Sequence, residues 1–293
     1  MEVALAIDIG GTKLAAGLVT DGGEVVVRQS VPTPAGHDAE VLWGRLSELV
    51  GQVASGSGGR RPLVCGVGCG GPMAPGGVTV SPLNIVAWRD FPLRERLAEL
   101  VGLPVYVDND AKALALGEAW AGAARGARDF VAMVVSTGVG GGLVVDGRLL
   151  DGAGGNAGHI GHVIVEPDGR VCGCGARGCL EAEASGLAIA AATGRPPAEA
   201  PDAVRRRAGR LVGRAVATVA NLLDIRLAVV AGSVALGYGE LFFRAAQDEI
   251  DARSRIEFAR GVTIVPAGLG ADGPLVGAAA VGWRGAGRPV GVA

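Results

Sequence analysis

Three cysteines and one histidine in the second half of the chain have the types and spacing of metal ligands. Cys172, Cys174 and Cys179 fall within eight positions of a glycine-rich stretch, and His162 lies just upstream. Three thiolates and one imidazole are typical of a closed tetrahedral zinc site. The alternative interpretation is that the three cysteines are buried free thiols. A zinc ion with four protein ligands has no open position for catalysis, so its predicted role is to fix the loop.

Two glycine-rich corners each follow an apolar stretch that reads as a buried strand. The first, at residues 10–13, follows residues 3–9, and the second, at residues 136–142, follows residues 130–135. Backbone amides at such corners can approach an anion closely, although a single glycine pair after a strand is more often an ordinary hairpin turn. Because the same unit opens each half of the chain, the corners predict a nucleotide held in a cleft between two related domains.

Two aspartates accompany these corners. Asp110 begins a predicted helix directly after a strand, where it is either a helix N-cap or a general base. A kinase needs one carboxylate to accept the proton of the attacking hydroxyl while metal and amides hold the phosphates. Asp8 lies near the end of the first strand. It is a candidate to order Mg²⁺ or its waters, and the alternative is a buried acid that accepts hydrogen bonds from the amides of the neighbouring turn.

Strands alternate with helices along the chain, and this alternation predicts a mixed α/β protein. The first three strands form an antiparallel meander. Strands are predicted at residues 3–9, 14–19, 24–31, 63–67, 105–107, 130–135, 143–145, 227–231 and 262–265. Helices are predicted at residues 38–53, 93–101, 110–121, 201–223, 240–253 and 274–283. Cys65 and Cys69, outside the cluster, are interpreted as core residues or as residues without a role.

Five motifs, in order along nearly the whole chain, resemble the ROK family of sugar kinases and repressors. The motifs are residues 8–13 (DIGGTK), 109–110 (ND), 136–142 (STGVGGG), 158–162 (GHIGH) and 172–181 (CGCGARGCLE). The resemblance implies an actin-like ATPase (ribonuclease H-like) two-domain fold with an interdomain cleft. It also implies ATP and Mg²⁺ as cofactors beside a structural Zn²⁺, and phosphorylation of a hexose 6-hydroxyl. The expected domains are residues 1–111 plus 278–293 and residues 112–277.

The resemblance also assigns roles to residues of this chain. Asp110 is the expected catalytic base, residues 68–72 should line the sugar site, and the C-terminal helix should return to the N-terminal domain. The expected substrate-binding residues are Asn84, Asn109, Asp110, His159, His162 and Glu181. The expected ATP- and phosphate-binding residues are Asp8, Gly10, Gly11, Thr12, Lys13, Thr137, Gly138, Gly140 and Gly232. The expected metal ligands are His162, Cys172, Cys174 and Cys179.

Two positions depart from the family pattern. His159 stands where most members have a glutamate that accepts hydrogen bonds from sugar hydroxyls, and Ala231 stands where glycine is usual. The His-x-Gly-His form is similar to that of some bacterial N-acetylmannosamine kinases. The family resemblance as a whole favours an ATP-dependent glucokinase. The departure at His159 makes an N-acylhexosamine kinase (N-acetylmannosamine or N-acetylglucosamine) the alternative. A non-catalytic sugar sensor and a polyphosphate-dependent kinase are weaker alternatives.

Composition narrows the remaining possibilities. The 293 residues are 49% hydrophobic with a formal net charge of -2, which suits two domains at roughly 150 residues each and gives no reason to expect a nucleic-acid partner. No signal sequence or long apolar run is apparent, so no membrane association and a cytoplasmic location are predicted. Only nine residues precede Gly10, which leaves no room for the helix-turn-helix segment of the family's repressors. A homo-oligomer, dimer or tetramer, is expected from the resemblance.

Overall fold

A computed structural model describes residues 1–292, which fold into two compact units. Of the described residues, unit 1 comprises 1–125, 151–157 and 269–292, and unit 2 comprises 126–150 and 158–268. The sequence-based division at residue 112 would separate the first two residues of a helix from the rest. In the structure the whole of this helix belongs to unit 1, and a short segment in the middle of the chain, residues 151–157, joins unit 1 as well.

Unit 1 is built on a five-stranded sheet with the order β3-β2-β1-β4-β5. Strands β1 to β3 form the predicted antiparallel meander, and β1, β4 and β5 run parallel. The strands are β1 (Val3–Ile9), β2 (Lys13–Thr20), β3 (Val25–Pro32), β4 (Val64–Cys69) and β5 (Val105–Asn109). The helices are α1 (Ala39–Ser55), α2 (Leu93–Val101), α3 (Asp110–Ala121) and α9 (Gly273–Gly285).

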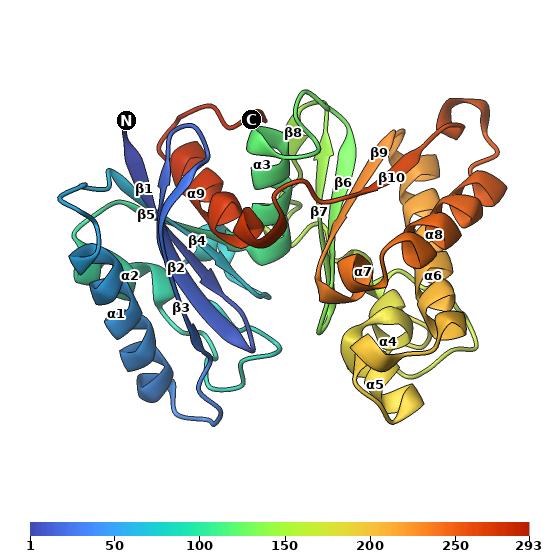
Figure 1. Cartoon of the computed structure of the whole chain (residues 1–293), viewed down its shortest axis with the longest axis horizontal. Helices are drawn as coiled ribbons and strands as arrows, with labels where there is room; N and C mark the ends of the chain where they lie inside the picture. Colours follow the sequence, from blue (N-terminus) through green and yellow to red (C-terminus); the bar gives the residue numbers. More distant parts are fainter. Residues whose placement is uncertain (293) are drawn as a thin grey trace. The chain divides into compact units, whose positions relative to one another are not determined.

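The two faces of this sheet carry side chains of different size. One face presents large residues such as Leu5 and Ile7, which join the apolar core with α1 and α2. The other presents small residues, and α9 packs directly on β4 and β1 there, beside α3 (Figure 1). At Gly66 of β4 a Cβ would lie 1.9 Å from the carbonyl oxygen of Ala278 in α9. Since no side chain fits in that space, the glycine lets the C-terminal helix pack on the N-terminal sheet, as the resemblance predicted.

Unit 2 is built on a second five-stranded sheet with the order β10-β9-β6-β7-β8. The strands are β6 (Phe130–Val135), β7 (Val139–Val145), β8 (Arg148–Leu149), β9 (Leu227–Ala231) and β10 (Thr263–Pro266). The helices are α4 (Leu180–Ala184), α5 (Gly186–Thr193), α6 (Asp202–Leu223), α7 (Ser233–Tyr238) and α8 (Glu240–Arg253). The long helices α6 and α8 pack against each other, and their apolar faces supply much of the core of this unit.

The mixed α/β class is confirmed, and one prediction about the second corner is wrong. The sequence predicts a glycine-rich corner over residues 136–142, whereas residues 139–142 are the first part of β7. Val139 pairs with Val135, and Gly140 to Gly142 continue the ladder with β6. The glycines have no side chains to reveal a strand pattern, but their backbone groups pair as in any strand. None of the described helices is long and apolar enough to cross a membrane.

Candidate active site

In unit 1 the two predicted acids lie at neighbouring strand ends. Asp8 is near the end of β1, and the ladder places Gly68 of β4 beside it and Asp108 of β5 beyond Gly68. A Cβ at Gly68 would lie 3.7 Å from a carboxylate oxygen of Asp8 and 3.6 Å from the Cα of Asp110. The missing side chain therefore leaves these two acids close to each other at one edge of the sheet.

The carboxyl group of Asp8 is poised between its two protonation states near neutral pH. Its pKa is raised to about 7, mainly by burial and also by the negative charge of Asp110, while the positive charge of Lys13 lowers it. Burial raises the pKa because removing a charged carboxylate from water costs free energy. Carboxylates with such raised pKa values are common at functional sites.

Replacing Asp8 by asparagine should therefore stabilise the unliganded protein at alkaline pH. The pKa of Asp8 is raised in the folded state, so the wild-type protein loses stability as the pH rises from about 4 to about 7. At about 1.4 kcal/mol per pKa unit, we expect the variant to gain about 1–4 kcal/mol in free energy of unfolding at pH 8 and less at pH 5. Urea denaturation at both pH values measures this, with Asp21→Asn in an exposed turn as the control. An equal gain at both pH values would contradict the role assigned to burial.

Asp110 is not the N-cap of its helix. Asn109 occupies that position in an extended conformation, and its side-chain oxygen accepts a hydrogen bond from the Ala111 amide at 3.0 Å. The carboxylate of Asp110 also accepts from the Ala111 amide, at 2.8 Å. Since Asn109 provides the cap, the fold of α3 does not depend on a carboxylate at position 110. This arrangement removes the main structural reason for an aspartate there and favours a chemical one.

The first glycine corner is a tight turn held by its neighbours. The Gly10 amide donates to the Lys13 carbonyl at 3.0 Å, and the Thr33 hydroxyl donates to the Gly10 carbonyl at 2.7 Å. Asn84, predicted on the sugar side, lies against this corner, since a Cβ at Gly11 would be 3.0 Å from the Cβ of Asn84. Residues 11–13 are exposed at the tip of the turn, where their amides and side chains are accessible to a ligand.

In unit 2, the second corner contacts two elements that the sequence separates widely. The Val139 amide donates to the carboxylate of Glu181 in α4 at 2.9 Å. The hydroxyl groups of Ser136 and Ser233 lie 3.0 Å apart, so the corner after β6 meets the corner after β9. The structure therefore gathers Thr137, Gly138 and Gly232 in one place, together with Glu181 from the predicted sugar site.

The four predicted metal ligands come together in unit 2. The ligand atoms of His162, Cys172, Cys174 and Cys179 all lie within 4.8 Å of one another. Sγ of Cys172 is 3.7 Å from Nδ1 of His162, and Sγ of Cys174 is 3.7 Å from Sγ of Cys179. At a zinc–sulfur distance of about 2.3 Å, neighbouring sulfurs of a tetrahedral site are about 3.8 Å apart. The cluster thus has the donor atoms and the spacing of a metal site.

The segment that carries the two histidines packs on the second corner. His159 precedes a short 3₁₀ turn, Ile160–His162, and the two histidine rings lie 6.0 Å apart between centroids. A Cβ at Gly161 would lie 2.2 Å from the carbonyl oxygen of Val139, so this segment touches β7 directly. Because Nδ1 of His162 faces the cysteines, Nε2 is the ring nitrogen that remains for another partner.

Sequence reasoning missed an ion group built around Lys112 of α3. The buried ammonium lies 3.0 Å from Asp108 and 2.5 Å from Asp151, and it also donates to the Gly155 carbonyl at 3.3 Å. These contacts fasten the segment 151–157 to unit 1 beside a cavity of about 350 Å³. Asp108 is in β5 and Lys112 is in the first turn of α3, so the four-residue spacing rule for helices does not predict the first pair. The second partner is remote in sequence, and no local pattern identifies it.

The structure thus assigns the predicted site residues to two groups, one in each unit. The group in unit 1 comprises Asp8, Gly10, Gly11, Thr12, Lys13, Asn84, Asn109 and Asp110. The group in unit 2 comprises Thr137, Gly138, Gly140, His159, His162, Cys172, Cys174, Cys179, Glu181 and Gly232. Cys65 and Cys69 are buried in the core of unit 1, as predicted.

Comparison with known proteins gives the family and the fold of the chain. The ROK family model matches residues 4–283. N-acetylmannosamine kinases of Citrobacter koseri and Escherichia coli are 41% and 39% identical to this chain, over 81% of it and 85% of their own length. A ROK family glucokinase from Streptomyces griseus, solved with glucose and AMPPNP, superimposes with a TM-score of 0.82 at 31% identity over 96% of this chain and 99% of its own. A ROK hexokinase from Thermus thermophilus superimposes with a TM-score of 0.80 at 34% identity over 98% of this chain and 100% of its own.

The chain belongs to the ROK family, as its motifs indicated, and the predicted actin-like α/β fold is confirmed. It is an ATP-dependent sugar kinase of that family.

Proposed function

We propose that the protein transfers the γ-phosphoryl group of ATP to the 6-hydroxyl of an N-acylhexosamine, with N-acetylmannosamine as the first candidate. The observation that carries this proposal is His159 together with the curated relatives. These relatives are named N-acetylmannosamine kinases at 39–41% identity. The His-x-Gly-His motif of residues 159–162 is the form that resembles such enzymes.

The chemistry of position 159 supports an acetamido sugar. A glutamate side chain only accepts hydrogen bonds when ionised, whereas a neutral imidazole has one donor and one acceptor nitrogen. An acetamido group offers both an N–H donor and a carbonyl acceptor. His159 can therefore donate to the carbonyl, which a glutamate in its place would meet with a negative charge. N-acetylglucosamine has the same group and stays an alternative within this class.

Glucose, which the sequence resemblance favoured, is the second candidate. The Streptomyces griseus neighbour was solved with glucose and AMPPNP, and its identity to this chain is 31%. The fold does not distinguish the two candidate sugars, because both kinds of kinase share it. A measured sugar preference distinguishes them.

In the proposed reaction, Asp110 accepts the proton of the sugar 6-hydroxyl as it attacks the γ-phosphorus. The amides and hydroxyls of the two corners hold the phosphate chain, and Lys13 contributes a positive charge. Mg²⁺ bound with ATP would neutralise phosphate charge, and the oxygen ligand that this chain offers it is the carboxylate of Asp8. Asn84, Asn109 and Glu181 would orient the sugar hydroxyls, so that positioning supplies much of the rate.

The metal cluster has a structural role in this proposal, and zinc is the ion that its donor set fits best. Three thiolates and one imidazole at tetrahedral spacing suit zinc, which would leave no open coordination position. With Nδ1 of His162 as a ligand, the proton of the ring stays on Nε2. That nitrogen then donates to a sugar hydroxyl in one fixed tautomer.

A substrate panel with a position-159 variant tests the sugar assignment. We expect kcat/KM of the wild type to be highest for N-acetylmannosamine among four sugars: N-acetylmannosamine, N-acetylglucosamine, mannose and glucose. His159→Glu should shift the ratio of N-acetylmannosamine to glucose activity by about 10- to 100-fold toward glucose, the scale of a lost polar contact to substrate. Coupled ADP-release kinetics with ATP and Mg²⁺ measure both.

His37→Glu is the matched control, because His37 is exposed and lies outside both groups of site residues. It should leave the sugar preference unchanged. A wild-type protein that prefers glucose would contradict the proposal and make His159 a tolerated variation. The homo-oligomer expected from the resemblance stays a prediction, which sedimentation velocity measures.

A further inference from the structure

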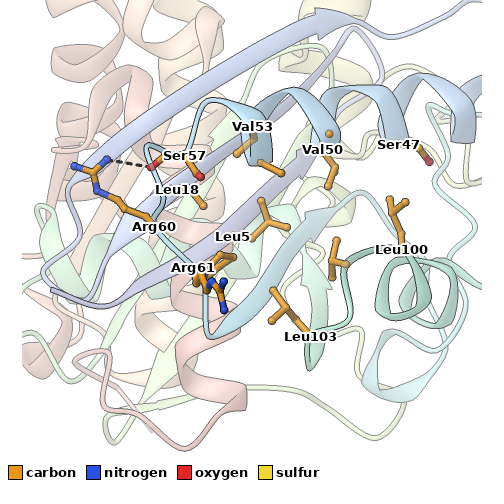
Figure 2. A pocket seen from close by; sticks show the side chains of 14 residues that line it. Leu5, Leu18, Ser47, Val50, Val53, Ser57, Arg60, Arg61, Leu100 and Leu103 are labelled. Atoms are coloured by element: carbon orange, nitrogen blue, oxygen red, sulfur yellow. Dashed lines mark hydrogen bonds between the residues drawn. The ribbon is translucent and has the colours of Figure 1, made fainter.

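A trough lies between α1 and α2 of unit 1, on the sheet face opposite α9. Helix α1 packs on β2 and β3, and α2 packs on β5, so the helices cover the outer strands. The space between them has a volume of about 450 Å³. Figure 2 shows Leu5 and Leu18 at the sheet side of this space, with Leu100 and Leu103 on the α2 side. The volume is in the range of known small-molecule sites, which is roughly 300–1,000 Å³.

This trough is separate from the residues assigned to phosphoryl transfer. Leu5 and Asp8 are both on β1, three residues apart, which is about 10 Å along a strand. Their side chains point to opposite faces of the sheet, since strand side chains alternate. Leu5 pairs in register with Leu18 at the end of the sheet remote from the glycine corner at residues 10–13. A ligand in the trough would thus not touch the kinase machinery.

The α1 wall of the trough is open where a side chain would normally stand. Gly51 lines the trough in the interior of α1, and a Cβ there would meet no other atom within 4 Å. Glycine is less favourable than alanine inside a helix. Packing does not require a glycine at position 51. The absence of a side chain there leaves free space in the trough beside its apolar side chains.

One end of the trough is positively charged. Arg60 and Arg61 line it together, as Figure 2 shows, and Arg60 donates to the Ser57 carbonyl at 3.2 Å. Across residues 1–292, neither guanidinium has a carboxylate within ion-pair distance, and the lining of the trough includes no acidic side chain. An apolar space that ends at two unpaired cations is complementary to an amphiphile with a negative head.

We propose that this trough binds a small monocarboxylate with a linear apolar tail. The carboxylate pairs with Arg60 and Arg61, because guanidinium groups suit carboxylate geometry. The tail lies over Leu5 and Leu18 toward Leu100. The lining part of α1, from Ser47 to Ala54, is about 10 Å long at roughly 1.5 Å per residue, and the lining continues to Ser57 beyond the end of the helix. A medium-chain acid such as decanoate is of similar length when extended.

Calorimetric titration of the full-length protein with decanoate, below its micelle concentration, tests the proposal. We expect one saturable site per chain. Decanol, which has the same tail without the charge, should bind at least about tenfold more weakly, and so should hexanoate, which buries fewer methylenes. The double variant Arg60→Gln/Arg61→Gln should lose the preference for decanoate over decanol.

Two glycine variants of one helix supply the matched pair. Gly51→Leu should fill the trough and weaken decanoate binding by at least about tenfold. Gly44→Leu is the control, since Gly44 is also inside α1 and also has no atom within 4 Å of a Cβ, but does not line the trough. Leucine is among the best helix formers, so both variants should fold, and melting temperature checks this.

Three outcomes would overturn the proposal: no saturable decanoate binding by the wild type, equal affinity for decanol, or equal loss of binding in the two leucine variants. The sugar-kinase assay distinguishes these outcomes from a failure of the proposed function. Both glycine variants should keep wild-type kcat and KM, because neither residue belongs to the catalytic or sugar-binding groups. Binding in the trough and phosphoryl transfer can therefore fail independently.

Discussion

Asp110→Asn should lower kcat by about 10²- to 10⁴-fold, the typical cost of losing a general base. The variant keeps the size and polarity of the side chain but cannot accept the proton of the attacking hydroxyl. The fold should survive, because Asn109 caps α3 and the asparagine oxygen can still accept from the Ala111 amide. Burial is the main cause of the raised pKa of Asp8, and removing the charge of Asp110 removes the repulsion that adds to it.

The measurement is coupled ADP release at saturating sugar, ATP and Mg²⁺, with the melting temperature of each protein alongside. Asp21→Asn makes the same chemical change in an exposed turn of unit 1 and should retain wild-type turnover. A folded Asp110→Asn protein with near wild-type kcat would refute the assignment of the base. The proposed sugar would be unaffected by that result, since the substrate panel tests it separately.

Cys174→Ser should remove the metal and lower kcat/KM by about 10- to 100-fold, the range seen when residues that support a metal site are lost. Cys174 is exposed, so its replacement removes no buried packing, and the effect reports the metal. Without the metal, His162 is no longer fixed by a bond to Nδ1, and the loop that leads to Glu181 loses its anchor. Elemental analysis should find one zinc per wild-type chain and little in the variant.

Cys65→Ala is the matched control for this experiment. Cys65 is buried in unit 1, outside the metal cluster. The Cys65→Ala variant should therefore retain full zinc content, whatever the substitution does to stability. An active wild-type protein purified without zinc would refute the structural role of the ion. Zinc content that survives in Cys174→Ser with activity lost would instead place Cys174 outside the coordination sphere.

The sequence alone was enough for elements whose signals are local. Helix α2 and helix α3 have the predicted bounds, because apolar spacing and the flanking breakers define both ends. Strands β6 and β9 also have their predicted bounds. The Cys3His cluster was identifiable for the same reason, since three of its four residues lie within eight positions and a loop of that length keeps them close.

Other features depend on contacts between residues remote in sequence. The start of β7 is a strand because β6 pairs with its glycines, and short elements such as β8 and α7 have too few residues for a periodic pattern. Lys112 finds Asp151 only after the segment 151–157 folds onto unit 1. The trough exists because α1 and α2 pack on different strands of the sheet. The sequence of neither helix determines the strand on which that helix packs.

The sequence by itself therefore determined the family and the class of reaction, through motifs that include the glycine corners, Asp110 and the Cys3His cluster, since those motifs are defined by residue type and short spacing. Tertiary structure decided which groups meet. It placed Asp8 beside Asp110 across a glycine, Glu181 against the Val139 amide and Ser136 against Ser233. The physical reason is that strand register and helix packing bring together residues from distant parts of the chain, and no local pattern encodes those meetings.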